Sequence, residues 1–202
     1  MWEHGVMRLI LASTSPARLS VLRGAGIDPI CIAPDIDEDA EVRAEEARLG
    51  RPLTTPEMVE YLGRLKAEDV QRRHGADLDG LILGGDSAFL LNGVTLGKPH
   101  VPDVALARAK EHRGSTGILH SGHWLINNTG GADRGAVGEV DTATVTLSAD
   151  LTDEDLALVL PRVLTAEDLG VALVRLVPFG VQNCAHRFSQ LRGIERVVHL
   201  AA

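Results

Sequence analysis

Short apolar runs and helical stripes of hydrophobic residues alternate along the first half of the chain. The apolar runs at residues 8–12 and 28–33 predict buried strands. Residues 17–26 and 57–74 instead repeat their hydrophobic positions every three or four residues, which is typical of helices that bury one face. Strands that alternate with helices in this way predict an α/β fold.

The middle of the chain, LILGGDSAFLLNGVTLGKP, predicts a hairpin. Residues 81–83 and 88–91 are apolar, and the glycine pair at 84–85 predicts a break between two strands. An Asn-Gly pair at 92–93 then precedes an apolar return strand at 94–96. This pair favours a type I′ turn, because both central residues of that turn need a positive φ.

Residues 115–127 and 136–147 predict a second pair of strands around a polar turn, after a helix at 102–113. Two hairpins among strand-helix units predict a mixed sheet and not a purely parallel one. The first of these strands holds His120 and His123. Residues three apart in a strand point to opposite faces, so the pair does not predict a zinc site.

The composition is that of an ordinary globular protein. The 202 residues are 45% hydrophobic and 24% charged, enough to bury the core of a single domain over residues 1–202. The formal net charge of -8 argues against a broad nucleic-acid contact, which needs a clustered basic face. Cys31 and Cys184 are far apart, and the sequence shows no signal peptide and no apolar run of 18 residues. We expect a cytoplasmic protein that binds neither nucleic acid nor membranes.

The loop at residues 13–16, STSP, combines hydroxyl groups with a well-marked helix start. Ser15 stands at the N-cap position and Pro16 at the first helical position. Free backbone N–H groups, the helix dipole and the hydroxyls of Ser13 and Ser15 would favour an anion there. Arg18 can add a fork of donors for phosphate. The alternative is a plain capped helix with a solvated Arg18, since the loop lacks the glycines of a P-loop.

Asp86 is the centre of the candidate chemistry. If residues 88–91 pair with residues 94–96, Lys98 lies near the same end of the hairpin as Asp86. A carboxylate beside a lysine suits a metal-bound polyphosphate, because Mg²⁺ takes one or two carboxylates together with phosphate oxygens. In this hypothesis Asp86 lies exposed in a cleft. The alternative is that Asp86 caps a turn and Lys98 is a solvated loop lysine.

Other residues have two interpretations each. Asp37 and Glu38 belong to the acidic segment DIDED at 35–39, which is either a solvated loop or helix start, or the end of a strand that gives the metal a second carboxylate. Lys66 lies in the middle of the long predicted helix, where a lysine is usually a surface residue. Gln182, in the tail, is either polar surface or a contact to a base edge.

Five segments follow the pattern of one known family in the same order. They are LILASTSPARLSVLRGAGI at 9–27, DIDED at 35–39, LGRLKAEDV at 62–70, LILGGDSAFLLNGVTLGKP at 81–99 and RGSTGILHSGHWLI at 113–126. Together they resemble the Maf family of nucleoside triphosphate pyrophosphatases, and the last segment is most similar to its actinobacterial branch.

The resemblance implies an elongated mixed β-sheet with flanking helices and two lobes around a central cleft, as in Maf and ITPase-like proteins, often as a homodimer. It also implies metal-dependent hydrolysis of the α-β phosphate bond of a nucleoside triphosphate to a monophosphate and pyrophosphate. The implied cofactor is Mg²⁺, Mn²⁺ or Co²⁺. The implied cellular roles are the removal of non-canonical nucleotides and the arrest of septum formation.

Carried over position by position, the resemblance also implies residue roles. Glu38 and Asp86 would hold the metal, and Asp86 would orient or deprotonate the attacking water. Arg18, Lys66 and Lys98 would neutralise the triphosphate. The implied catalytic residues are Asp86, Glu38, Lys66 and Lys98, and the implied substrate-binding residues are Ser13, Ser15, Arg18 and Gln182.

Parts of the chain depart from the family pattern. Ala17 stands where the family has the first arginine of its phosphate loop, and residues 161–170 and 191–202 match its late motifs poorly or not at all. Because the C-terminal third is divergent, an alternative is a nucleotide-binding or regulatory homologue with weakened catalysis. A nucleotidyltransferase fits less well, because the first loop lacks a glycine-rich entry. Release of pyrophosphate on hydrolysis of a nucleotide would distinguish the pyrophosphatase from the binding homologue and the nucleotidyltransferase. No motif identifies the base of the nucleotide.

Overall fold

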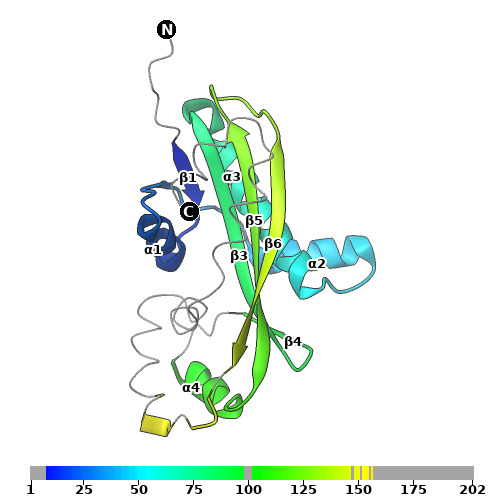
Figure 1. The fold of residues 1–202 in the computed structure, drawn as a ribbon. Coiled ribbons are helices and arrows are strands. Elements are labelled where there is room, and N and C mark those ends of the chain that lie inside the picture. Colours follow the sequence, from blue (N-terminus) through cyan, green and yellow to red (C-terminus); the bar gives the residue numbers. More distant parts are fainter. Residues whose placement is uncertain (1–7, 98–101, 147, 151, 155, 157–202) are drawn as a thin grey trace.

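The computed structural model describes residues 8–97, 102–146, 148–150, 152–154 and 156, and its centre is one mixed sheet (Figure 1). The strands are β1 Leu9–Ala12, β2 Ile30–Cys31, β3 Gly80–Leu91, β4 Val94–Leu96, β5 Thr116–Asn128 and β6 Ala136–Thr146. Their order is β2-β1-β3-β5-β6, with β4 beside β3. β1 is parallel to β2 and β3, and the other pairings are antiparallel. The predicted mixed sheet is confirmed.

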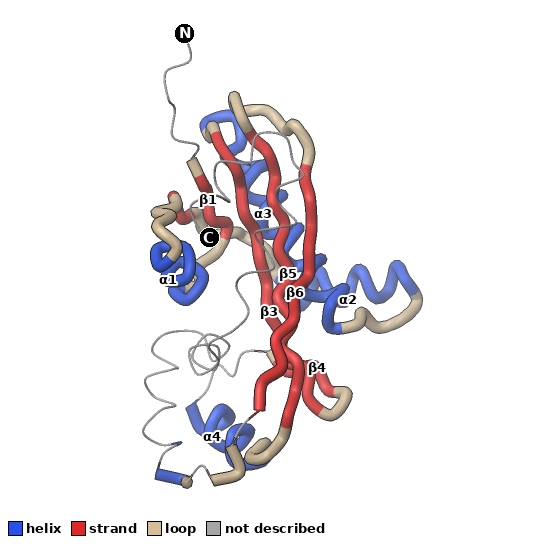
Figure 2. The backbone as a smooth tube through the Cα atoms, viewed as in Figure 1, coloured by secondary structure: helices blue, strands red, loops and turns tan. Residues whose placement is uncertain are grey.

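The helices cover the sheet unevenly. They are α1 Pro16–Gly24, α2 Glu38–Leu49, α3 Thr55–His74 and α4 Pro102–Glu111, with a short 3-10 helix at Gly75–Asp77. α3 packs along β3 and β5, α1 lies beside β1, and α2 projects away from the sheet (Figure 2). Within the described part of the chain, no helix has the length and apolar character that a membrane span needs.

Both long helical patterns start with the caps that their sequences offer. The Ser15 hydroxyl caps α1, and Pro16 is its first residue, as predicted. α3 begins slightly before the predicted position, at Thr55. The reason is a capping box in which Glu57 Oε2 accepts hydrogen bonds from the backbone N (2.9 Å) and the hydroxyl (2.8 Å) of Thr54.

The break predicted at residues 84–85 is wrong, because β3 continues through both glycines in unbroken register with β5. The first glycine serves packing instead. A Cβ on Gly84 would lie 2.7 Å from the Ala67 nitrogen and closer still to the Gly63 carbonyl oxygen. The backbones of α3 and β3 therefore meet directly, and Ala67 joins Ile82 in the hydrophobic core.

The Asn-Gly hairpin is confirmed, with φ of 50° at Asn92 and 78° at Gly93, as a type I′ turn requires. α4, β5 and β6 lie within a few residues of their predicted positions. β2 is shorter than the predicted strand at 28–33, and both of its residues are exposed at the sheet edge, where few groups can hold an extended strand. The expected division into two lobes around a cleft stays a prediction.

One edge of β3 is only partly paired. β5 occupies the opposite edge along residues 80–90, while β1 pairs with residues 81–84 and β4 with residues 89–91 on this edge. No other strand of the described part of the chain reaches residues 85–88 between them. We call this interval the sheet gap. The loop at 13–15 follows β1 directly, and β1 ends beside Gly84, so this loop begins at the border of the gap.

Candidate functional site

Lys66 joins two carboxylates at the sheet gap. Its Nζ donates a hydrogen bond to Asp86 Oδ1 at 2.7 Å and forms an ion pair with Glu38 Oε1 at 2.9 Å. Lys66 is 6% exposed and Asp86 is 8% exposed, whereas about half of the Glu38 side chain reaches solvent. We call these three residues the ion cluster. With two carboxylates and one ammonium it is net negative, which favours a further cation.

Each member of the ion cluster comes from a different element. α3 presents Lys66 from the face that packs on the sheet. β3 points Asp86 to the side of Gly84, the side that α3 covers, because alternate residues of a strand share a face. Glu38 is the first residue of α2, whose N-cap is Asp37. The local sequence indicated Asp86 and Glu38 as candidates, and the family resemblance added Lys66. The structure brings the three together.

Two expectations about exposure, and one about position, are corrected. Lys66 is not a surface residue, because it lies on the packed face of α3 and Asp86 neutralises its charge there. Asp86 is not exposed in a cleft, because α3 covers it. The acidic segment is the start of α2 and not the end of a strand, so Glu38 combines a helix first turn with a place in the ion cluster.

A second group surrounds Arg18 at the same gap. Arg18 Nη1 donates to Ser13 Oγ at 3.2 Å, and Nη2 donates to Ser87 Oγ at 3.1 Å. Ser87 Oγ shares a hydrogen bond with Ser121 Oγ at 2.9 Å. We call Arg18, Ser13, Ser87 and Ser121 the hydroxyl cluster. The predicted helix start supports it, since Ser15 N donates to Ser13 Oγ at 3.1 Å.

The hydroxyl cluster is positively charged. Arg18 makes no ion pair with any residue that the structure describes, so its charge is available to an anion. His123 lies next to it, and its pKa is lowered to about 4, first by burial and then by the charge of Arg18, against an opposing effect of Asp141. His123 is therefore neutral at pH 7 and does not add a second positive charge.

The two clusters lie on opposite faces of β3. A Cβ on Gly84 would meet α3, whereas a Cβ on Gly85 would lie 3.2 Å from Arg18 Nε. The next two residues repeat this alternation, since Asp86 bonds to Lys66 and Ser87 bonds to Arg18. Adjacent residues of the sheet gap therefore contribute to different clusters, Asp86 to the ion cluster and Ser87 to the hydroxyl cluster.

Sequence reasoning missed Ser87, Ser121 and His123 as site residues. The sequence analysis considered His123 only as a zinc ligand and did not consider the two serines as site residues. The available signal was the period of two in the strands, which puts Ser121 and His123 on one face of β5. The antiparallel register then pairs Ser121 with Ser87.

The ion cluster fits a hard divalent cation that is also bound by substrate. In the described part of the chain, no group of three or more His, Cys, Asp or Glu residues could hold a metal ion by itself. Glu38 and Asp86 supply two carboxylates, which is the number that Mg²⁺ commonly takes when phosphate oxygens and water complete its shell. Lys98 and Gln182, two further predicted site residues, lie outside the described residues.

Comparisons with known proteins identify the family of the chain. A family model described as "Maf-like protein" matches residues 8–164. The chain belongs to this family. A protein of Leifsonia xyli named "Nucleoside triphosphate pyrophosphatase" is 52% identical over 74% of this chain and 69% of its own length. One of the same name from Corynebacterium diphtheriae is 39% identical over 70% of this chain and 65% of its own length.

Among solved structures, a HAM1 protein from Coxiella burnetii aligns with a TM-score of 0.43 and 12% identity over 73% of this chain and 76% of its own. A nucleoside-triphosphatase, dITP/XTP pyrophosphatase, from Mycobacterium abscessus aligns with a TM-score of 0.37 and 17% identity over 86% of this chain and 100% of its own. Membership in the Maf-like family does not depend on either alignment.

Proposed function

We propose that this chain is a nucleoside triphosphate pyrophosphatase that hydrolyses the α-β phosphate bond of a canonical or non-canonical nucleotide, with Mg²⁺, Mn²⁺ or Co²⁺ as cofactor. The observation that carries the proposal is the pair of clusters at the sheet gap. A net negative cluster suits a metal ion, and a cationic cluster lined by hydroxyls suits phosphate. The names of the Maf-like relatives support the same activity.

In the proposed reaction a water oxygen forms a bond to the α-phosphorus. The bond from that phosphorus to the bridging oxygen breaks, and pyrophosphate leaves with its electron pair. Asp86 takes the proton of the water. Lys66 engages only Oδ1 of Asp86, and Oδ2 accepts no hydrogen bond from the described residues, so Oδ2 is the oxygen that receives the proton. Lys66 and Arg18 offset the negative charge of the triphosphate.

Glu38 and Asp86 are the residues that would hold the metal. When bound, the ion would neutralise phosphate charge and make the phosphorus more electrophilic. Lys66 fixes the orientation of both carboxylates through a single ammonium group, which keeps the two ligands close before substrate arrives. Lys98 remains our candidate for a further phosphate contact and Gln182 for a contact to the base.

The same proposal includes a homodimer that acts in the cytoplasm on free nucleotides, without nucleic acid or membrane as partner. We also propose a role in nucleotide house-cleaning or in septum formation, as the family resemblance implies. A second function, a nucleotide-binding homologue with weakened catalysis, is favoured by Ala17. That residue is buried where the family has an arginine, so α1 lacks one phosphate contact.

The test is pyrophosphate release from a panel of canonical and modified nucleoside triphosphates, with each of the three metal ions and without metal. We expect metal-dependent release from a subset of the panel, with the monophosphate as the other product. Asp86→Asn serves as the inactive control. Release of inorganic phosphate alone would contradict cleavage of the α-β bond. Nucleotide binding without any turnover would replace the enzyme with the binding homologue.

A further inference from the structure

α2 carries Glu38 but has little packing of its own. None of its residues is buried, and the helix projects away from the sheet (Figure 1). A helix without a fully buried residue gains little from hydrophobic contacts, so its position depends largely on polar contacts. These are the side-chain hydrogen bond between Glu41 and Tyr61 of α3 and the contacts at the two ends of α2. The position of Glu38 relative to Lys66 therefore depends on whatever holds the beginning of α2.

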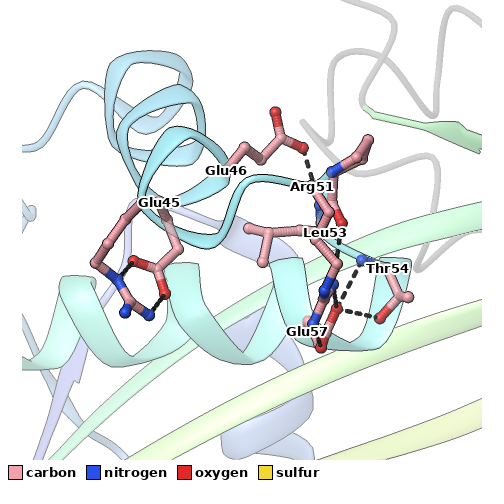
Figure 3. Close-up of polar contacts among 8 residues, drawn as sticks. Glu45, Glu46, Arg51, Leu53, Thr54 and Glu57 are labelled. Carbon is pink, nitrogen blue, oxygen red and sulfur yellow. Dashed lines mark hydrogen bonds and ion pairs between the residues drawn. The ribbon is translucent and has the colours of Figure 1, made fainter.

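The end of α2 is tied to the beginning of α3. These contacts are far along the chain from Glu38, which is the first residue of α2. Glu46 Oε1 accepts a hydrogen bond from Leu53 N at 3.0 Å, and Arg51 donates two hydrogen bonds, at 2.8 and 2.7 Å, to the Glu57 carboxylate (Figure 3). These contacts are largely exposed and belong to the connection between the helices. They do not fix the first turn of α2.

The beginning of α2 is tied to α3 by a buried carboxylate. Asp69 Oδ2 accepts hydrogen bonds from Asp35 N and from Arg73 Nε, both at 2.8 Å. Arg73 Nη2 in turn donates to the Ala33 carbonyl oxygen at 2.7 Å. Asp69 is 5% exposed, so these bonds are shielded from water. The segment that leads into Glu38 is thus clamped to α3.

The residues of the clamp are close in sequence to Lys66 and Glu38, which form the ion pair of the site. Asp69 comes one helical turn after Lys66 on α3, and Asp35 comes three residues before Glu38. Burial would by itself raise the pKa of Asp69, but the hydrogen bonds from Arg73 and Asp35 and the charges of the arginines lower it below its ordinary value. Asp69 is therefore ionised at pH 7 and accepts all of these bonds.

We infer that Asp69, together with Arg73, is a positioning residue that holds Glu38 against Lys66. The inference rests on the proposed function only in giving Glu38 a metal to bind. Asp69 itself does not touch the ion cluster in any hydrogen bond or ion pair of the described residues. It acts through the backbone of residues 33–37.

The test measures how strongly Glu38 and Lys66 are coupled, with and without the clamp. The coupling comes from a double-mutant cycle of Glu38→Gln and Lys66→Met in urea unfolding of the full chain. We expect a measurable coupling in the wild-type background and loss of that coupling in the Asp69→Asn background. If Asp69→Asn does not fold, Arg73→Lys takes its place in the test. This variant keeps a positive charge for Asp69 but is too short to reach Ala33, so it should weaken the coupling.

Arg72→Met is the matched control. Arg72 binds the same Asp69 carboxylate at 2.5 Å, but it makes no hydrogen bond to residues 33–37 and is mostly exposed. Its removal should leave the coupling between Glu38 and Lys66 unchanged. A coupling that survives both Asp69→Asn and Arg73→Lys would overturn the inference, and so would an equal loss in Arg72→Met.

A second readout uses turnover. We expect Asp69→Asn to lower kcat and to raise the Mn²⁺ concentration for half-maximal activity about tenfold, and to have no further effect on either value when Glu38 is already Gln. An additive effect in that background would contradict positioning through Glu38. If the wild type releases no pyrophosphate, the proposed function fails, while the coupling measured by unfolding still decides the role of Asp69.

Discussion

The ion cluster and the hydroxyl cluster occupy neighbouring residues of one strand and differ in how their charges are balanced. In the ion cluster two carboxylates share the ammonium of Lys66, and the group is covered by α3. In the hydroxyl cluster Arg18 has only neutral serine hydroxyls as partners among the described residues. The first group therefore has an excess of negative charge, and the second has a positive charge without an acidic partner.

In the proposed function, this difference lets a single strand serve a metal and a phosphate at once. Asp86 and Ser87 are adjacent, but their side chains point to opposite faces, so opposite charges are kept apart until a ligand enters the sheet gap. If Arg18 lay on the face of Asp86, the added positive charge would cancel the net negative charge of the ion cluster, and the hydroxyl cluster would have no cation for a phosphate.

The largest effect is expected from a change at Asp86. Asp86→Asn should lower kcat about 10³-fold, or roughly 4 kcal/mol in the barrier, because the amide cannot take a proton from water. It should also lower the free energy of unfolding by about 2 kcal/mol, since Lys66 loses a buried charged partner. Ser87→Ala, one residue along, is the control and should raise KM without changing kcat. A wild-type kcat in Asp86→Asn would remove Asp86 from the chemistry.

The glycine pair offers a comparison of the two faces by stability. Gly84→Ala should cost more than about 3 kcal/mol, because the added methyl group would overlap the backbone of α3. Gly85→Ala should cost less, because the methyl group would lie 3.2 Å from Arg18 Nε and 3.3 Å from the Gly122 carbonyl oxygen, which are longer distances than those at Gly84. Urea unfolding and KM together check this. Equal losses of stability would contradict the assignment of the two residues to different faces.

His123 makes the hydroxyl face sensitive to acid. Its pKa is lowered to about 4 in the folded state, so between about pH 6.5 and 4 the unfolded chain binds a proton that the folded chain does not. Stability should therefore fall as the pH is lowered through this window, by roughly 3 kcal/mol.

Unfolding of wild type and His123→Phe at pH 7 and pH 4 measures this contribution, which should be missing in the variant. Asp141→Asn provides the opposite test. The charge of Asp141 raises the pKa of His123, so its removal should lower that pKa further in an NMR titration. A His123 that titrates near its ordinary pKa would contradict the buried position.

The smallest effect is expected at the far end of the hydroxyl cluster. Ser121→Ala removes the 2.9 Å hydrogen bond to Ser87, so Ser87 would hold Arg18 less firmly. A loss of about 1 kcal/mol corresponds to a KM raised roughly fivefold at constant kcat. Thr95→Val is the matched control, because it removes another hydroxyl pair, Thr55–Thr95 at 2.7 Å, away from the hydroxyl cluster. An equal rise of KM in both variants would argue against a role for Ser121 in the site.

The sequence by itself determined the local elements. Ser15 and Pro16 start α1, the Asn-Gly pair closes the β3–β4 hairpin, and the mixed sheet follows from the order of strands and helices. These features depend on groups a few residues apart, whose preferences act before the chain is folded. The local sequence also indicated Asp86 and Glu38, the family resemblance added Lys66, and the structure placed the three together.

Only the tertiary structure decided the burial and the charge partners of those residues. Lys66 is buried, although its helix position alone indicated a surface residue, because α3 packs on β3 at Gly84. The glycine pair continues a strand instead of breaking it, and the roles of Ser87, Ser121 and Asp69 depend on contacts with residues distant in sequence. Burial, face and charge partner are properties of the packed chain, since each depends on which distant segment lies opposite.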